Sequence, residues 1–141
     1  MFDLTGLTIL VVEDEFFLAD EIASALSAVG AQVAGPAGSV AAAMKIVEGD
    51  TMLHAALLDV NLVGEKVFSV ADSLLQRGTP FVFATGYDAD VIPERHRGAA
   101  RIAKPAAVEQ IIRALISATS EHLSHVRSAE LNVSIENAHK L

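Results

Sequence analysis

The feature that most constrains this chain is a repeated alternation of short apolar runs with helical patterns. There are five apolar runs, and all but the fourth are followed by a stretch whose apolar residues recur at helical spacing. Strands that alternate with helices are typical of a parallel sheet covered on both faces. The sequence therefore predicts an α/β protein with a doubly wound sheet of five parallel strands. The predicted strands are residues 8–12, 32–34, 54–58, 81–84 and 101–103, and the predicted helices are residues 16–29, 39–47, 67–76 and 108–118.

Local signals set the expected ends of these elements. Ser39 is a suitable N-cap for the second helix. Gly35-Pro36 is expected to break the second strand, because proline lacks an N–H for the sheet. Pro93 and Gly98 leave room for only a short helix between the fourth and fifth strands. The helical spacing of the first helix places Phe17 on its apolar face.

Length and composition indicate one globular domain. The chain has 141 residues, of which 52% are hydrophobic and 20% charged, and this is enough to bury a core without disulfides. The absence of cysteine excludes disulfides, thiolate metal sites and a thiol nucleophile. We predict a domain over residues 1–119 and a C-terminal extension over residues 120–141, either a further helix or a disordered tail.

Charge and hydropathy narrow the functional classes. The formal net charge of −8 argues against nucleic-acid binding by the chain as a whole. The N-terminus has no basic signal-peptide region, and no apolar run reaches the length of a membrane span. The expectation is a soluble, cytoplasmic protein.

Polar residues follow four of the five predicted strands. In an open parallel sheet, the carboxyl ends of the strands meet at one edge, where ligands bind. These residues should therefore converge. They are Glu13, Asp14 and Glu15 after the first strand, Asp59 and Asn61 after the third, Thr85 after the fourth and Lys104 after the fifth.

The converging residue types suit metal-assisted phosphoryl chemistry. Carboxylates brought close together repel one another, and Mg²⁺ relieves this repulsion because it prefers oxygen ligands. The predicted metal ligands are Glu13, Asp14, Asp59 and the carbonyl of Asn61. A phosphoryl group on Asp59 would meet the ammonium of Lys104 and, in addition, the hydroxyl of Thr85. Glu15 is expected near the site without binding the metal.

This set of motifs resembles the signature of CheY-like response-regulator receiver domains. The resemblance covers about residues 7–118 and rests on Val12-Glu13-Asp14-Glu15, Leu58-Asp59-Val60-Asn61-Leu62, Thr85 and Lys104-Pro105. It implies a flavodoxin-like fold with strand order 2-1-3-4-5. It also implies Asp59 as the phosphoacceptor, Asp14 as the principal metal ligand, Thr85 as the switch hydroxyl and Lys104 as the phosphate-contacting lysine. The Lys104-Pro105 peptide is expected to be cis, as is common in that family.

The chain departs from the family pattern at three places. Arg101 stands where the family usually has the aromatic switch residue, and we expect Arg101 or Tyr87 to replace it. Val63-Gly64 stands where a proline is common, and the interval between Thr85 and Lys104 is short. Phe83-Ala84-Thr85-Gly86-Tyr87 resembles the motif of an alphaproteobacterial subgroup whose members are often single-domain and pair with kinases of the HWE type.

The implied function is that of a stand-alone response regulator in a two-component phosphorelay. A sensor histidine kinase or phosphotransfer protein would phosphorylate Asp59 in a Mg²⁺-dependent reaction, and the chain would catalyse only its own phosphotransfer and dephosphorylation. Output would be contact with a downstream protein target, or diversion of phosphate as a sink. Nucleic acid and membrane are not expected as partners, and a homodimer is left open.

Two alternatives remain open at this stage. The first is a degenerate receiver that acts as a constitutive interaction module, which Arg101 keeps open. The second is a phosphatase with an aspartyl-phosphate intermediate, disfavoured because position 61 is Asn where a second acid is needed. A basic cluster is a candidate binding patch, although a solvated loop is the favoured interpretation. Its members are Arg95, His96, Arg97 and Arg101.

Overall fold

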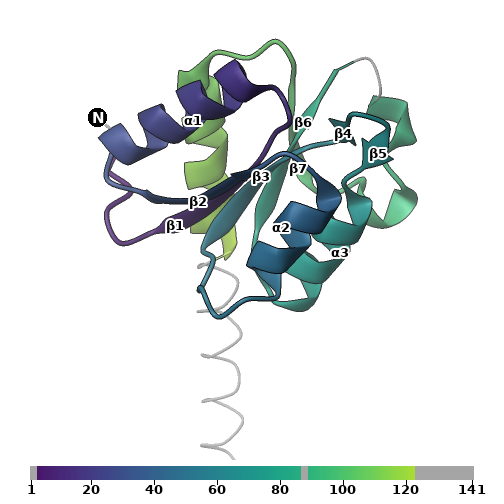
Figure 1. The fold of residues 1–141 in the computed structure, drawn as a ribbon, viewed down its shortest axis with the longest axis horizontal. Coiled ribbons are helices and arrows are strands. Elements are labelled where there is room, and N and C mark those ends of the chain that lie inside the picture. Colours follow the sequence, from purple (N-terminus) through teal and green to yellow (C-terminus); the bar gives the residue numbers. More distant parts are fainter. Residues whose placement is uncertain (1–2, 87–88, 123–141) are drawn as a thin grey trace, which may run out of the picture.

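The structure is built on one sheet of five parallel strands. A computed structural model describes residues 3–86 and 89–122 (Figure 1). The strand order β2-β1-β3-β6-β7 confirms the predicted order 2-1-3-4-5, because β4 and β5 form a separate hairpin. The sheet strands are β1 (Thr8–Val12), β2 (Gln32–Ala37), β3 (Ala55–Asp59), β6 (Phe81–Thr85) and β7 (Ala100–Ala103). The hairpin strands are β4 (Asn61–Leu62) and β5 (Glu65–Lys66), which the sequence analysis did not predict.

Helices cover both faces of the sheet and divide the core into two layers (Figure 1). Because successive strand side chains point to opposite faces, Ile9 and Val11 pack on one layer while Leu10 and Val12 pack on the other. The first layer contains α1 (Phe16–Ala28) and a C-terminal helix that begins at residue 108. The second contains α2 (Val40–Val47) and α3 (Phe68–Gln76).

The helix ends follow the local signals in the sequence. The Ser39 hydroxyl accepts a hydrogen bond from the N–H of Ala42 at 3.1 Å, which confirms the predicted N-cap of α2. Such a cap stabilises a helix by about 1 kcal/mol. After α3, Gly78 takes a left-handed φ of 71°, a conformation that suits glycine at a helix end.

Two local expectations were wrong. Strand β2 does not break at Gly35-Pro36 but continues to Ala37, and the register with β1 shifts between Leu10 and Val12 to accommodate these two residues. The peptide between Gly35 and Pro36 is cis. Phe17 is not part of the core: it is 81% exposed, beside the ring of Phe16, which is 75% exposed.

The connection between β6 and β7 contains no α-helix in its described part, residues 89–99. Two single 3₁₀ turns, at Ala89–Val91 and Glu94–His96, take the place of the helix that the parallel crossover would normally contain. The prediction that this connection has little room for a helix is thus confirmed, and 3₁₀ turns stand in place of the short helix.

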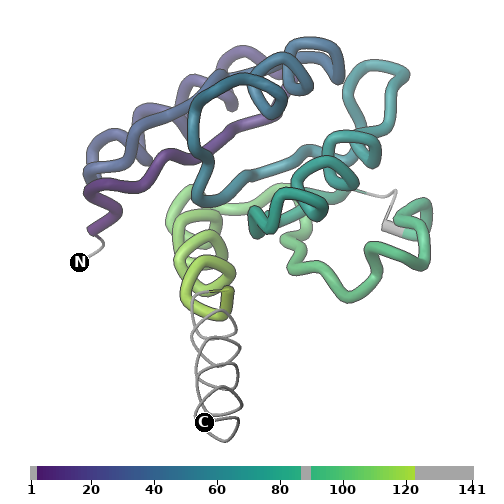
Figure 2. Tube along the Cα trace, turned by 90° about the horizontal axis from the view of Figure 1, so that it is seen from below, coloured from purple at the N-terminus to yellow at the C-terminus, as the bar shows by residue number. Residues whose placement is uncertain are grey.

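The C-terminal helix crosses the predicted domain boundary at residue 119 without interruption and reaches residue 122. Ile111, Ile112 and Leu115 of this helix are buried in the core layer that it shares with α1, and Figure 2 draws its described turns in yellow-green. Residues 123–141, most of the predicted C-terminal extension, lie outside the described residues. No helix within the described part of the chain has the length and apolar character needed to cross a membrane.

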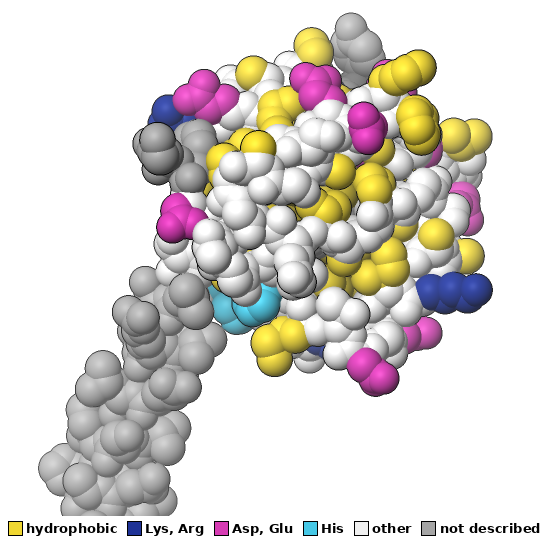
Figure 3. Space-filling view, turned by 60° about the vertical axis from the view of Figure 1, so that its left-hand side comes forward, with side chains coloured by type: hydrophobic (Ala, Val, Ile, Leu, Met, Phe, Trp, Pro, Cys, Tyr) yellow, Lys and Arg dark blue, Asp and Glu magenta, His cyan; other side chains and the backbone are white. Residues whose placement is uncertain are grey.

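One side of the molecule carries a concentration of apolar side chains. Figure 3, in which the left-hand side of Figure 1 comes forward, shows hydrophobic side chains in the middle of this face and acidic side chains mostly around its rim. The edge strand β2 lies on this side in Figure 1. Its Val33 and Ala34 are partly buried and Pro36 is exposed.

Candidate functional site

The carboxyl ends of β1, β3 and β7 bring three charged side chains together. Glu13 follows β1 directly, and its N–H donates to the carbonyl of Ala37 at the end of β2. Asp59 is the last residue of β3, and Lys104 comes directly after β7. The strand-end geometry predicted from the sequence is therefore what positions these groups.

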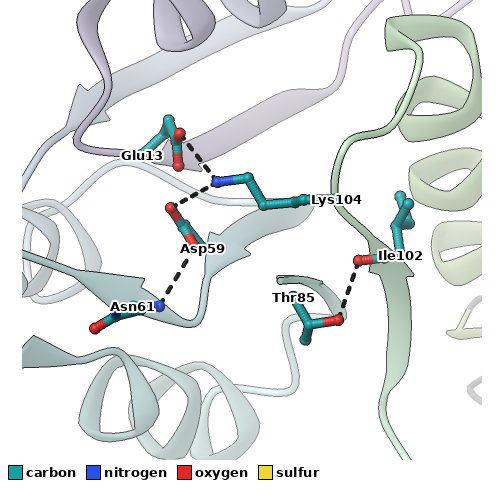
Figure 4. Close-up of polar contacts among 6 residues, drawn as sticks. All are labelled: Glu13, Asp59, Asn61, Thr85, Ile102 and Lys104. Atoms are coloured by element: carbon teal, nitrogen blue, oxygen red, sulfur yellow. Dashed lines mark hydrogen bonds and ion pairs between the residues drawn. The ribbon is translucent and has the colours of Figure 1, made fainter. Parts of the chain in front are cut away.

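Lys104 bridges the two carboxylates (Figure 4). Its Nζ lies 3.0 Å from Oδ2 of Asp59 and 3.3 Å from Oε1 of Glu13. Both carboxylates are buried, with 6% and 5% of the residue exposed for Asp59 and Glu13, whereas the Lys104 side chain is 29% exposed. One ammonium thus serves two buried acids, an arrangement that leaves negative charge in excess. The Lys104-Pro105 peptide is cis, as predicted.

This charge imbalance appears in the proton affinities of the cluster. Burial, together with the neighbouring Asp59, raises the pKa of Glu13 from 4.5 to about 8, although Lys104 acts in the opposite direction. Burial disfavours the Lys104 ammonium, but the Asp59 and Glu13 carboxylates outweigh that effect and raise the pKa of Lys104. The site therefore favours added positive charge, either as a proton on Glu13 or as a cation.

Asp14 completes a carboxylate group that can hold a metal ion. Glu13, Asp14 and Asp59 each offer an oxygen, and these atoms lie within 4.8 Å of one another. Three carboxylates with partial solvent access fit a hard divalent cation that keeps some of its waters, such as Mg²⁺. Of the three, Asp14 is the least buried.

Asn61 lies beside the cluster and is held on two sides. Its backbone N–H donates to Oδ1 of Asp59 at 3.3 Å, so both oxygens of Asp59 accept hydrogen bonds (Figure 4). Its side-chain oxygen accepts from Nζ of Lys66 at 3.1 Å, across the β4–β5 hairpin. Lys66 is not among the predicted site residues, because the sequence does not predict the hairpin that brings it back to Asn61.

A cavity of about 880 Å³ opens at the cluster. Glu13, Asp14, Asp59 and Lys104 line it, together with apolar residues of α1 and the C-terminal helix, among them Ile111. Ligands can therefore reach the carboxylates although two of these are buried.

Thr85 lies at the end of β6 but its hydroxyl does not point into the cluster. The hydroxyl donates to the carbonyl of Ile102 on β7 at 3.4 Å, and the residue is 3% exposed (Figure 4). The link from Thr85 to the cluster runs through the backbone, because the Lys104 N–H donates to the Thr85 carbonyl at 2.6 Å.

The remaining predicted residues are Arg101, Tyr87 and Glu15. Arg101 is exposed on β7, where it is the register partner of Phe83. Tyr87, the other candidate readout residue, lies outside the described residues. Glu15 is exposed at the start of α1 and lines the cavity.

The favoured interpretation of the basic cluster as a solvated loop was wrong for His96, whereas Arg95 remains exposed. His96 is 3% exposed, and its Nε2 lies 2.6 Å from Oδ1 of Asp72 on α3. Arg95 binds the same carboxylate through Nε and Nη2 at 2.8 and 3.0 Å. No sequence pattern predicts this contact, because it depends on how the segment between β6 and β7, which has no α-helix in its described part, packs against α3.

Comparison with known proteins agrees with this arrangement. No model of a known protein family and no curated protein matches the sequence. Among solved structures, SdrG from Sphingomonas melonis is 35% identical, with 80% of this chain and 95% of that chain covered and a TM-score of 0.62. The N-terminal domain of a response regulator/sensory box/GGDEF protein from Carboxydothermus hydrogenoformans is 27% identical, covering 84% and 98%, with a TM-score of 0.71.

A CheY-like response regulator receiver domain from Methanospirillum hungatei has the same fold. It is 21% identical, with 84% of this chain and 98% of that chain covered and a TM-score of 0.74. The strand order and these similar structures define one class of fold, the receiver fold. The chain has the fold of CheY-like response regulator receiver domains.

Proposed function

We propose that the chain is a response regulator whose Asp59 accepts a phosphoryl group from a histidine kinase or phosphotransfer protein. The observation that carries this proposal is the bridge from Lys104 to Asp59 and Glu13 beside an accessible cavity. In this bridge a carboxylate that could act as the nucleophile lies beside an ammonium and beside oxygens that could bind a metal ion. This is the equipment that phosphoryl transfer needs, because charge neutralisation and positioning dominate that reaction.

In the transfer step, an oxygen of Asp59 forms a bond to phosphorus. The phosphorus–nitrogen bond of the donor phosphohistidine breaks, and its electron pair stays on the imidazole nitrogen. The Lys104 ammonium would then bind a phosphoryl oxygen as well. This interaction would compensate the negative charge that the phosphoryl group adds at Asp59. The Asn61 N–H holds the second Asp59 oxygen in place.

Glu13, Asp14 and Asp59, with the Asn61 carbonyl, would hold Mg²⁺. When bound, the ion neutralises carboxylate and phosphoryl charge in a site that otherwise has one ammonium for two buried acids. Thr85 would contribute by turning its hydroxyl from the Ile102 carbonyl toward the phosphoryl group. This rotation would exchange one hydrogen bond for another and would alter the contact between β6 and β7.

We also propose where the chain acts, what it catalyses and how it signals. The chain would act in the cytoplasm, would catalyse only its own phosphotransfer and dephosphorylation, and would signal through a protein target or as a phosphate sink. The Phe-Ala-Thr-Gly-Tyr motif supports the subgroup that pairs with HWE-type kinases. The formal net charge of −8 supports a protein partner over nucleic acid.

The test is phosphorylation with acetyl phosphate and with candidate kinases, with and without Mg²⁺, followed by intact mass spectrometry. We expect one phosphoryl group per chain, released by hydroxylamine as an acyl phosphate is, and none on the Asp59→Asn variant. Asp50→Asn, which changes an exposed acid in the loop after α2, is the matched control and should be phosphorylated normally. Phosphorylation that persists in Asp59→Asn, or that never occurs, would overturn the proposal.

A further inference from the structure

The segment between β6 and β7 is fastened to α3 at a single carboxylate, that of Asp72. Arg95 binds both oxygens of this carboxylate, at 2.8 and 3.0 Å, and His96 contacts Oδ1 at 2.6 Å. The Arg95 bond lowers the pKa of Asp72, so the group is ionised at neutral pH. An ionised carboxylate only accepts hydrogen bonds, and therefore Nε2 of His96 carries the hydrogen.

His96 also lies deep enough to contact the core on both sides. Its ring stacks on Phe68 of α3 at a centroid distance of 6.3 Å and meets Phe83 of β6 edge-on at 5.8 Å. Phe83 is two residues before Thr85 on the same strand. One side chain of the segment is thus in contact with both the strand that carries Thr85 and the helix that carries Asp72.

The contact of Asp72 with Arg95 and His96 is called the Asp72 clamp below. It matters because the segment between β6 and β7 has little regular structure of its own. Residues 89–99 contain two 3₁₀ turns, each too short to support itself. Ile92 anchors the segment in the core, with 2% exposed. Within the described residues, the side-chain hydrogen bonds that Arg95 and His96 make all end on Asp72.

We propose that the Asp72 clamp joins residues 89–99 to α3, so that the two respond as one unit when Asp59 is phosphorylated. The inference rests on the function proposed above. A change at Thr85 moves the end of β6, the Phe83–His96 contact passes that change to the segment, and the clamp passes it to α3. This assigns readout to α3 and the 3₁₀ segment, not to Arg101, which is exposed on the far strand of the sheet. Asp72 and His96 are positioning residues in this account, since neither lies among the residues that line the phosphoacceptor cavity.

The test follows backbone amide signals by NMR on addition of beryllium fluoride with Mg²⁺, a stable mimic of the phosphoryl group. In the unaltered chain, we expect shifts around Asp59 and Lys104, in residues 89–99 and in α3. In Asp72→Ala the shifts around Asp59 should remain and those in α3 should be lost. Asp72→Asn, which still accepts a hydrogen bond from His96, should restore part of the α3 response. His96→Phe keeps an aromatic ring without the donor and should behave like Asp72→Ala.

Glu109→Gln is the matched control, because it removes an exposed carboxylate–arginine pair from the C-terminal helix. It should leave the α3 response intact. An α3 response that survives in both Asp72→Ala and His96→Phe would overturn the inference while leaving the proposed function standing, as would an unaltered chain that responds at Asp59 but not in α3. Absence of any shift around Asp59 in the unaltered chain would overturn the proposed function itself, and the inference with it.

Discussion

The two charge clusters of this molecule are built from the same kinds of side chain but differ in balance. At the strand ends, Glu13 and Asp59 share the single ammonium of Lys104. On α3, the single carboxylate of Asp72 is bound by both Arg95 and His96. The first cluster has more negative charge than its cation can satisfy, and the second has a fully satisfied carboxylate.

Burial makes this difference consequential. The carboxylates at the strand ends are more than nine-tenths buried, whereas the Asp72 side chain is 44% exposed. Excess charge in a buried site is costly, and a metal ion or proton that relieves it binds favourably. A satisfied carboxylate near the surface has no such affinity and serves to hold two elements together. The difference in charge balance thus distinguishes a site suited to binding a cation from a contact suited to holding two elements together.

The largest expected effect comes from removing the cation of the strand-end cluster. Lys104→Met leaves Glu13 and Asp59 without a counter-charge and should lower the free energy of unfolding by about 3 kcal/mol without metal at neutral pH. Asp59→Asn removes one of the repelling carboxylates and should raise it. Urea denaturation of both variants checks this pair of opposite signs. A loss of similar size in both would show that the cluster is not short of positive charge.

The second prediction concerns pH. The pKa of Glu13 is raised to about 8 in the folded protein, so the proton is bound more tightly there than in the unfolded chain. This stabilisation is complete below the ordinary pKa of 4.5 and declines as the pH rises toward about 8. For one proton the slope is at most about 1.4 kcal/mol per pH unit.

Metal-free denaturation curves between these pH values would measure this slope. Glu13→Gln should flatten it, whereas Asp50→Asn should keep it. An unchanged slope in Glu13→Gln would assign the titration to another group.

The third prediction uses Mg²⁺ itself. At a concentration ten times its Kd, the ion should stabilise the folded chain by about 1.4 kcal/mol. Asp14→Asn should weaken this stabilisation by removing a ligand, with little effect on metal-free stability because Asp14 is only partly buried. Thermal denaturation across a Mg²⁺ titration gives both values. Equal Mg²⁺ response in the variant would exclude Asp14 as a ligand.

The smallest expected effect lies at the satisfied cluster. Asp72→Ala leaves the buried His96 without its acceptor and should cost about 1 kcal/mol. Glu109→Gln breaks an exposed pair on a helix surface and should cost only about 0.3 kcal/mol. Urea denaturation with both variants side by side distinguishes them. Equal costs would mean that His96 gains nothing from Asp72.

The strand-end cluster could be predicted from the sequence because topology determines it. Once the chain is recognised as alternating strands and helices, the carboxyl ends of parallel strands must share an edge. Glu13, Asp59 and Lys104 then meet whatever the intervening residues are. The cap at Ser39 was predictable from local chemistry, whereas the strand order was implied by the resemblance to receiver domains.

The details that could not be predicted depend on side-chain direction and on irregular backbone. Position at a strand end does not determine that the Thr85 hydroxyl turns to the Ile102 carbonyl. Helical spacing places Phe17 on an apolar face, but it does not say whether another element covers the start of that helix. The Asp72–His96 contact joins residues 24 apart through a segment without helix, which no periodicity describes.

Strand β2 has a further consequence at high protein concentration. Among the residues that the structure describes, no strand pairs with its outer edge, and such an edge is a template for pairing with a second chain. Pro36 supplies no N–H, and the register shift beside Gly35 interrupts the regular spacing of donors and acceptors. Gly35-Pro36, which the sequence suggests as a strand break, thus disfavours polymerisation of the folded molecule through this edge of its sheet.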